Sequence, residues 1–244
     1  MPVLEKGRYR VRTAGGAEVD RALALRALAF RGGAGAAEGD AIDTRCRHML
    51  VEEAATGDLV ATFRILPLSS GADLAQSYAA QFYDLSALAA YPGRMIELGR
   101  FCLHPDRHDP DILRLAWGAV TRAVDAEGAG LLFGCSSFKG TDAREFRDAF
   151  ALLGERHLAP KRWRPKVKAP RVFRFGRVRA GVATDVRQAL LRMPPLLRTY
   201  LAMGGWVSDH AVVDAELGTL HVFTGLEIGR IPPARARALR LVAG

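Results

Sequence analysis

An α/β (α+β) fold, with a mixed central sheet and helices on both of its faces, is the fold class that the sequence predicts. The first observation behind this prediction is a β-hairpin at residues 48–66, in which two apolar strands flank the turn Ala55–Asp58. The second is that short apolar strands alternate with helical stretches beyond the hairpin, as they do in sheets covered by helices. The sequence contains no internal repeat and no clear linker, so we expect a single domain over residues 1–244.

The elements up to residue 103 follow from local patterns. Residues 18–31 carry apolar side chains at helical spacing, and a glycine-rich turn ends that helix. The hairpin strands are residues 48–53 and 59–66, and an alanine-rich stretch at 72–90 is expected to be helical. Residues 94–103 (RMIELGRFCL) form an apolar strand that is interrupted by one glutamate and one arginine.

The second half of the chain continues the alternation. Gly128 and Gly130 follow one long helical stretch, and Pro195 stands at a helix start, where proline is well tolerated. In order, helices are expected at residues 111–127, 141–153, 184–193 and 195–203, and strands at residues 130–136, 207–213 and 219–223.

The composition is that of a globular protein, with 49% hydrophobic and 25% charged residues. No apolar run approaches the roughly 18–20 residues that a transmembrane helix requires. The N-terminal MPVLEKGRYRVRT lacks the apolar core of a signal peptide. Cys46, Cys102 and Cys135 show no CxxC spacing, which predicts reduced thiols and neither a zinc site nor disulfides. A cytoplasmic protein is therefore expected.

The net charge of +9 predicts attraction to an acidic partner, which could be nucleic acid, an anionic membrane surface or an acidic protein. Much of the excess lies at residues 156–179, which contain ten Lys or Arg and no acidic residue. Prolines 160, 165 and 170 prevent a helix there, so an extended, solvent-facing segment is expected. A solvated loop and a docking surface both fit, and the one-sided charge favours docking.

Three kinds of site find little support in the motifs. His104 and His108 are separated by Pro105, so they cannot share a helical face as metal ligands, and no metal site is expected. The stretch GCSSFKG at residues 134–140 only loosely resembles the G-x-S-x-G turn of serine hydrolases. No glycine-rich phosphate-binding loop of a known type is present.

Glu97 and Arg100 are the residues that require an explanation, because burying a charge is costly unless it is paired. A carboxylate in a partly apolar strand has a raised proton affinity, which suits a general base. A structural ion pair is as consistent with the sequence as a catalytic role. A spacing of three on a strand places the two side chains on opposite faces, unless a β-bulge resets the alternation.

Several stretches, in the same order along the chain, resemble the ornithine N-acyltransferases of ornithine lipid synthesis. A weaker similarity is to the acyl-homoserine-lactone synthases, and both families are variants of the GNAT acyltransferase fold. The stretches that carry the resemblance are DAIDTRCRHMLVEEAATGDLVATFRILP (40–67), YDLSAL (83–88), ELGRFCLHPDRH (97–108), LFGCSSFKGTD (132–142), HLAP (157–160) and MPPLLRTYL (193–201).

The resemblance implies transfer of a 3-hydroxyacyl chain from acyl carrier protein to the α-amino group of L-ornithine. No bound cofactor is then expected, because phosphopantetheine arrives on the carrier protein. The loop that holds coenzyme A in ordinary GNAT enzymes is missing here, and residues 104–118 contain Asp109 and Asp111, which suit a phosphate poorly. An acidic carrier protein gives the basic surface a partner, and an anionic membrane face is a further possible partner.

The resemblance also implies roles for individual residues. Glu97 would accept the ammonium proton, and Arg100 is assigned to the catalytic set beside it. The substrate-binding candidates are Asp40, Asp43, Arg64, Asp84, Ser137 and Asp142, and the carrier-protein docking candidates are Lys161, Arg162, Arg164, Lys166 and Lys168. One departure is that related sequences tend to read EFD where this chain reads Phe82-Tyr83-Asp84.

Three alternatives remain open at this point. The acceptor could be another amino acid, or the donor could be acyl-CoA. A nucleic-acid-binding protein would use the basic segment with Trp163, Phe173 and Phe175 as stacking partners. No DNA- or RNA-binding motif is present, so nucleic acid is not the expected partner.

Overall fold

The computed structural model describes residues 2–33, 38–176 and 184–244. These residues form two compact units, each assembled from segments that are distant in the sequence. The first unit comprises Met1–Pro67, Ile96–Ala129 and Pro232–Gly244, and the second comprises Leu68–Met95 and Gly130–Ile231. Whether the two units together make one domain, as the sequence predicts, stays a prediction.

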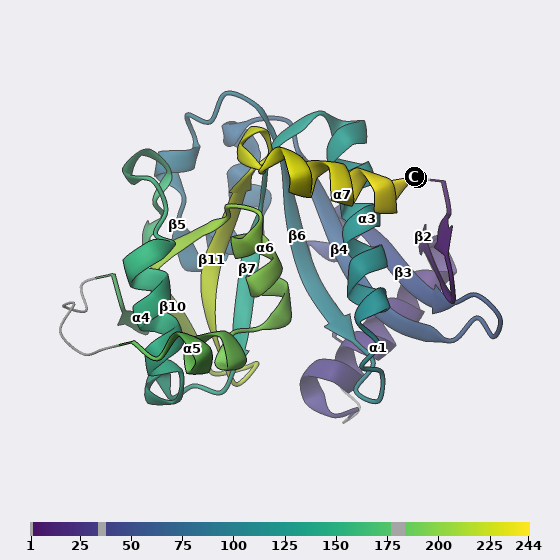
Figure 1. Cartoon of the computed structure of the whole chain (residues 1–244), viewed down its shortest axis with the longest axis horizontal. Coiled ribbons are helices and arrows are strands. Elements are labelled where there is room, and N and C mark those ends of the chain that lie inside the picture. Colours follow the sequence, from purple (N-terminus) through teal and green to yellow (C-terminus); the bar gives the residue numbers. More distant parts are fainter. Residues whose placement is uncertain (1, 34–37, 177–183) are drawn as a thin grey trace. The chain divides into compact units, whose positions relative to one another are not determined.

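The first unit contains a sheet in which five strands are adjacent in the order β1-β2-β3-β4-β6 (Figure 1). Their bounds are β1 Leu4–Lys6, β2 Tyr9–Thr13, β3 Arg47–Glu53, β4 Leu59–Leu68 and β6 Arg94–Leu103. β1 to β4 pair antiparallel, and His48 on β3 lies opposite Arg64 on β4. The predicted hairpin and the strand at residues 94–103 are confirmed, whereas β1 and β2 were not predicted.

Three helices belong to the same unit. They are α1 Val19–Arg31, α3 Pro110–Glu127 and α7 Pro233–Ala243, with the short 3-10 helices η1 Gly16–Glu18 and η2 Asp43–Arg45. α1 ends at Gly32, whose φ of 70° is the left-handed conformation that favours glycine. α7 was not predicted, because its alternating arginines and alanines show little amphipathic pattern. It packs on α3, and Val242 lies against Gly118.

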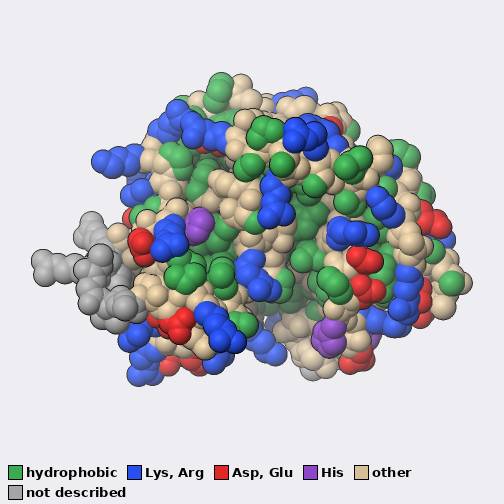
Figure 2. All heavy atoms as spheres, viewed as in Figure 1, with side chains coloured by type: hydrophobic (Ala, Val, Ile, Leu, Met, Phe, Trp, Pro, Cys, Tyr) green, Lys and Arg blue, Asp and Glu red, His purple; other side chains and the backbone are tan. Residues whose placement is uncertain are grey.

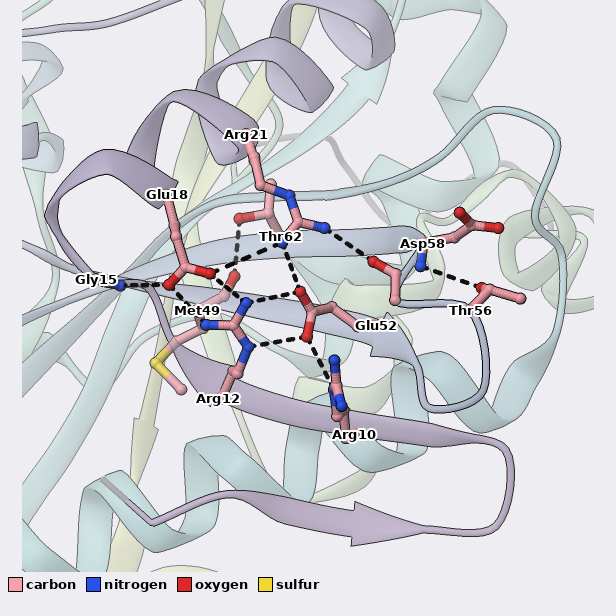
Figure 3. Close-up of polar contacts among 11 residues, drawn as sticks. Arg10, Arg12, Gly15, Glu18, Arg21, Met49, Glu52, Thr56, Asp58 and Thr62 are labelled. Carbon is pink, nitrogen blue, oxygen red and sulfur yellow. Dashed lines mark hydrogen bonds and ion pairs between the residues drawn. The ribbon is translucent and has the colours of Figure 1, made fainter.

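A buried carboxylate ties α1 to the sheet of this unit (Figure 3). Glu52 is 1% exposed and accepts hydrogen bonds from Arg10, Arg12 and Arg21 at 2.8–3.0 Å. Burial alone would raise the pKa of Glu52, but these hydrogen bonds outweigh burial and hold the pKa at about 2. Arg12 also binds Glu18 at the start of α1. These arginines are therefore structural.

The second unit contains a sheet in which β7, β11, β10 and β9 are adjacent in that order and antiparallel. The bounds are β7 Ala129–Lys139, β9 Val172–Arg174, β10 Trp206–Asp214 and β11 Thr219–Glu227. The helices are α4 Arg147–Arg156, α5 Val186–Arg192 and α6 Pro195–Ala202, with η5 Ala143–Phe146 and η7 Ile228–Arg230. A core of apolar side chains, including Phe138, Phe150, Leu197 and Val222, joins these helices to the sheet.

The prediction of one helix at residues 72–90 is wrong. The stretch forms η3 Gly71–Gln76, α2 Ala79–Phe82, β5 Tyr83–Asp84 and η4 Ser86–Leu88. Its chain folds back so closely that a Cβ on Gly71 would lie 2.1 Å from the carbonyl oxygen of Ala89. Ser77 closes η3 by donating a hydrogen bond to Leu74, and β5 pairs with β8. Tertiary pairing thus overrides the helix propensity of the alanines.

The basic segment is extended, as predicted, but it is not simply solvent-facing. It contains η6 Lys161–Trp163, β8 Lys166–Val167, which pairs with β5, and β9, which pairs with β10. Pro165, Ala169 and Phe175 are buried. Residues 177–179 of the segment lie outside the described residues.

Replacing Gly225 by alanine should destabilise the second unit by roughly 1–3 kcal/mol, the usual cost of overpacking. Trp206 lies directly over this glycine, and an added Cβ would be 2.4 Å from the ring. Chemical denaturation followed by tryptophan fluorescence gives the free energy of unfolding. Gly229→Ala, with nothing within 4 Å of the new Cβ, is the matched control and should be neutral. Equal stability of the two variants would contradict this packing.

Candidate functional site

A backbone irregularity in β6 brings Glu97 and Arg100 to the same side of the strand. Arg100 has φ of 51°, which makes it the one non-glycine residue with positive φ in the described part of the chain. A left-handed residue inside a strand is a feature of one class of β-bulge, the G1 type. A Cβ on Gly99 would lie 3.4 Å from Nε of Arg64, while Arg100 binds Asp40, which Arg64 also binds. The consecutive residues Gly99 and Arg100 thus both face the pair formed by Arg64 and Asp40. Because residues two apart on a strand share a face, Glu97 lies on the same face as Gly99.

Asp40 is the centre of an ion-pair network in the first unit. Its Oδ1 accepts a hydrogen bond from Nη1 of Arg64 at 2.6 Å, and its Oδ2 accepts one from Nη2 of Arg100 at 2.9 Å. Burial alone would raise the pKa of Asp40, but the two guanidinium groups lower it below the ordinary range. The carboxylate therefore stays ionised and bridges β4 to β6.

Asp43 extends the network towards α1. Its Oδ1 accepts hydrogen bonds from Nη1 of Arg64 at 2.6 Å and from Nη1 of Arg26 at 2.7 Å. Its other oxygen accepts a hydrogen bond from the backbone N–H of Asp40 at 2.8 Å, and Nε2 of His48 lies 3.6 Å from Oδ1. Burial opposes ionisation, yet these donors lower the pKa of Asp43. The loop that carries both aspartates is thereby fixed against the sheet.

Glu38 closes the network on the side of Arg100. Its carboxylate lies 3.3 Å from Nη1 of Arg100 and 2.6 Å from Nε of Arg31. The side chain is buried although it is charged. A buried carboxylate between two guanidinium groups is the arrangement that makes such burial tolerable.

Glu97 lies beside this network and near Cys46. The glutamate is 3% exposed, between the fully buried Ile96 and the buried Leu98. Burial raises the pKa of the Cys46 thiol to about 11, Arg64 opposes this shift, and Glu97 adds to it, as do the two aspartates. The thiol is thus protonated near neutral pH and surrounded by the charged groups. A thiol with a raised pKa is a poor nucleophile.

Four arginines, Arg26, Arg31, Arg64 and Arg100, bind three carboxylates in this cluster, those of Glu38, Asp40 and Asp43, and Glu97 lies beside them. Asp40 and Asp43 are engaged by guanidinium groups, which occupy the lone pairs that an ammonium ion would use. That the two aspartates bind the substrate stays a prediction, and their ion pairs also hold the arginines in place.

Arg26, Glu38 and Cys46 belong to the cluster although sequence reasoning did not single them out. Arg26 has a detectable signal, because it shares with Ala22 and Leu25 the buried face of α1, where an arginine is out of place. Glu38 has no such pattern around it. Its position became clear only from its contacts with Arg31 and Arg100.

Three of the predicted substrate-binding residues lie in the second unit. Asp84 accepts a hydrogen bond from the backbone N–H of Ser86, which lowers its pKa, and Lys166 lies opposite it in the β5–β8 pair. Asp142 begins η5 and pairs with Arg144, which holds its pKa at about 2. Ser137 is exposed on β7. Their roles in substrate binding stay predictions.

The neighbouring Tyr83 is fully enclosed. Its hydroxyl donates a hydrogen bond to the backbone carbonyl of His221 at 2.8 Å, and its ring packs against His210 and Phe223. Burial lowers the pKa of His221 to about 4, so this imidazole is neutral near pH 7. The departure from EFD at residues 82–84 therefore sits in a structural cluster.

The five predicted docking residues do not all face solvent. Lys161, Arg162, Lys166 and Lys168 are exposed, whereas Arg164 is half-buried and donates to the carbonyl of Ala159 at 2.8 Å. Among the four exposed residues, Arg162 lies 3.6 Å from the carboxylate of Glu227, and Lys168 donates a hydrogen bond to the carbonyl of Ala80 at 2.6 Å. Arg164 instead holds the turn that presents these four residues.

No group of three or more His, Cys, Asp or Glu side chains is arranged to hold a metal ion within the described residues. In the same part of the chain, none of the helices combines the length and apolar character that crossing a bilayer requires.

Comparisons with known proteins place the chain among acyltransferases. Residues 26–118 match the Acetyltransferase (GNAT) domain family. An L-ornithine N(alpha)-acyltransferase of Rhodobacter capsulatus is 35% identical over 190 residues, which cover 76% of this chain and 72% of the relative. A protein of the same name from Brucella abortus is 30% identical over 202 residues, which cover 80% of this chain and 71% of the relative.

The crystal structure of TofI in an apo form aligns with 15% identity and a TM-score of 0.46, over 97% of this chain and 99% of that one. The prediction of a GNAT-like α+β fold is confirmed.

Arg26→Met should lower the free energy of unfolding, near the lower end of the roughly 3–5 kcal/mol typical of removing one partner from a buried ion pair. The loss is at the lower end because Arg64 still binds Asp43. Chemical denaturation measures the effect. Arg144→Met, which removes the exposed partner of Asp142, is the matched control and should leave the unfolding midpoint unchanged. An unchanged midpoint for Arg26→Met would contradict a stabilising pair.

Proposed function

Because the chain belongs to the L-ornithine N(alpha)-acyltransferase family, we propose that it transfers a 3-hydroxyacyl chain from acyl carrier protein to the α-amino group of L-ornithine. The product is a lyso-ornithine lipid. The observation that carries this proposal is the 35% identity to the Rhodobacter capsulatus enzyme, which extends over 76% of the chain. Two details of this proposal have other support. The 3-hydroxyl group of the acyl chain rests on the family resemblance, and the carrier protein as donor rests on the resemblance and on the positive charge of the chain.

Glu97 is the general base in this proposal. Ornithine arrives as an ammonium ion, and Glu97 accepts its proton directly or through a water molecule. The free amine then attacks the thioester carbonyl carbon, so a C–N bond forms and the carbonyl oxygen becomes negative. When the intermediate collapses, the C=O bond re-forms and the C–S bond breaks, and the phosphopantetheine sulfur leaves as a thiolate. The nitrogen, which became positively charged on attack, loses a proton to give the amide, and the thiolate takes up this proton to give the thiol.

The backbone of β6 supplies stabilisation for the oxyanion. The bulge at Arg100 interrupts regular strand geometry directly after Glu97. N–H groups beside a bulge are released from the ladder and are available for another acceptor. Preorganised N–H donors of this kind are a large contribution to acyl transfer.

Arg64 and Arg100 act as positioning residues. Both bind the Asp40 carboxylate, so neither guanidinium can turn without breaking a buried ion pair. The rigidity holds the β6 backbone, and with it Glu97, in one arrangement. The alternative in which these arginines bind the ornithine carboxylate requires them to exchange a partner that they already hold.

The basic surface made by Lys161, Arg162, Lys166 and Lys168 is the docking site for the carrier protein. These side chains are exposed, and the paired strands β5 and β8 hold the backbone beneath Lys166. A rigid patch of positive charge steers an acidic partner and fixes its orientation. The enzyme needs no resident cofactor, since phosphopantetheine arrives on the carrier protein.

Mass spectrometry of the purified protein with 3-hydroxypalmitoyl carrier protein and a mixture of all amino acids tests the proposal. A new mass of hydroxyacyl-ornithine is expected. A product on another amine would reject ornithine as the acceptor. An equal yield from 3-hydroxypalmitoyl-CoA would reject dependence on the carrier protein.

Glu97→Gln should lower kcat by roughly 10²–10⁴-fold, the usual loss for a general base, because the amide cannot accept the ammonium proton. The two side chains have nearly the same shape, so the circular dichroism spectrum should stay unchanged. Initial rates of ornithine acylation measure the effect. Glu5→Gln makes the same chemical change at an exposed position and serves as the control. A Glu97→Gln variant with normal kcat would remove Glu97 from the mechanism.

The double variant Lys161→Glu/Lys166→Glu should raise the KM for acyl carrier protein by about tenfold while the KM for ornithine stays constant, because surface charges act on encounter with the acidic partner. The increase should shrink at high salt. Arg235→Glu/Arg237→Glu reverses two exposed charges on α7 and is the matched control. Equal changes in both KM values would argue against docking at this surface.

A further inference from the structure

Large apolar side chains are exposed at few places in the described residues. These are Val3, Val186, Leu190, Leu191 and Leu241. Three of the five lie on the seven-residue helix α5 of the second unit (Figure 1). The inner side of α5 is fixed by Ala189, which is fully buried in the core with α4. Leu190 and Leu191 therefore project outward, with exposed fractions of 44% and 65%.

The surroundings of these leucines are positively charged. Residues 186–203, which include α5 and α6, contain Arg187, Arg192 and Arg198 and no acidic residue. All three arginines are exposed, and none forms an ion pair with another described residue. The acidic Asp185 just before α5 is already used, because its side chain accepts a hydrogen bond from the N–H of Gln188 at 3.0 Å.

This combination differs from the other basic surface of the second unit. The described residues between Lys161 and Lys168 present charge without any exposed large apolar side chain. α5 presents both. Figure 2 shows how Lys and Arg side chains are interspersed with hydrophobic ones on the face that it draws. Charge alone suits an acidic protein, whereas leucines flanked by unpaired arginines suit the boundary between lipid headgroups and acyl chains.

We propose that α5 docks the protein reversibly on an anionic lipid bilayer. Leu190 and Leu191 enter the boundary between headgroups and acyl chains, while Arg187, Arg192 and Arg198 contact lipid phosphates. The inference deepens the proposed function and rests on it in one respect, which is that an acylated amino acid is an amphiphile and partitions into lipid. A short helix with two inserted leucines gives weak binding, so the protein exchanges between the bilayer and solution.

Vesicle sedimentation with the full chain tests this proposal. Vesicles of phosphatidylcholine with phosphatidylglycerol should bind the protein, vesicles of phosphatidylcholine alone should bind it much less, and salt should weaken the binding. Leu190→Ser/Leu191→Ser should raise the vesicle Kd by roughly tenfold or more, because two apolar side chains lose their lipid contact. Arg187→Glu/Arg192→Glu should abolish the preference for anionic vesicles.

The matched control is Val3→Ser/Leu241→Ser, which removes two equally exposed apolar side chains from the first unit and should bind vesicles like the wild type. The proposal is overturned if the Leu190/Leu191 variant binds vesicles normally. It is also overturned if that variant instead changes the KM for carrier protein or the oligomeric state in gel filtration, since a protein would then be the occupant. Ornithine acylation without vesicles is measured separately. Normal acylation without vesicle binding rejects the docking alone, and vesicle binding without acylation rejects the proposed function alone.

Discussion

The site depends on one carboxylate that bridges two strands. Asp40 binds Arg64 on β4 through one oxygen and Arg100 on β6 through the other. Arg100, which binds Asp40, has a backbone in the left-handed conformation, and this conformation costs energy for a residue with a Cβ. Strain of this kind persists where the surrounding contacts over-determine it. The ion pairs to Asp40 and Glu38 provide those contacts, so the bulge and the network stabilise each other.

The same network decides what the charged residues can do in catalysis. Each buried guanidinium in it already has a carboxylate partner, and each aspartate has a guanidinium partner. Groups held in this way orient their neighbours better than they bind a mobile substrate, because a new partner would have to displace an old one in a buried setting. Glu97 stands beside the network on a strand whose backbone the network holds. A fixed base near fixed N–H donors is what acyl transfer to an amine requires.

Much of this arrangement could be predicted from the sequence. The apolar run with two interrupting charges predicts β6 with its exact bounds, and the cost of burying unpaired charge singles out Glu97 and Arg100, whereas the two aspartates follow from the resemblance. The sequence indicates only that a β-bulge would be needed to bring Glu97 and Arg100 to one face. It does not predict the bulge itself, because no residue pattern marks an arginine with positive φ. Arg26 was missed because α1 was judged by its apolar residues, and the helix at residues 72–90 was wrong because strand pairing at Tyr83 is a long-range effect.

The positively charged residues that have acidic partners and those that lack them lie in different parts of the chain. In the first unit, the arginines around Asp40 and Glu52 are neutralised by carboxylates, and they serve the fold and the site. In the second unit, Arg187, Arg192, Arg198 and Lys161 have no acidic partner among the described residues. Ionic attraction at long range comes from uncompensated charge, because paired charges cancel within a few ångströms. In the second unit, uncompensated positive charge is therefore directed outward both at a purely charged surface and at one with exposed leucines. This difference in chemistry is the reason to assign them to different partners.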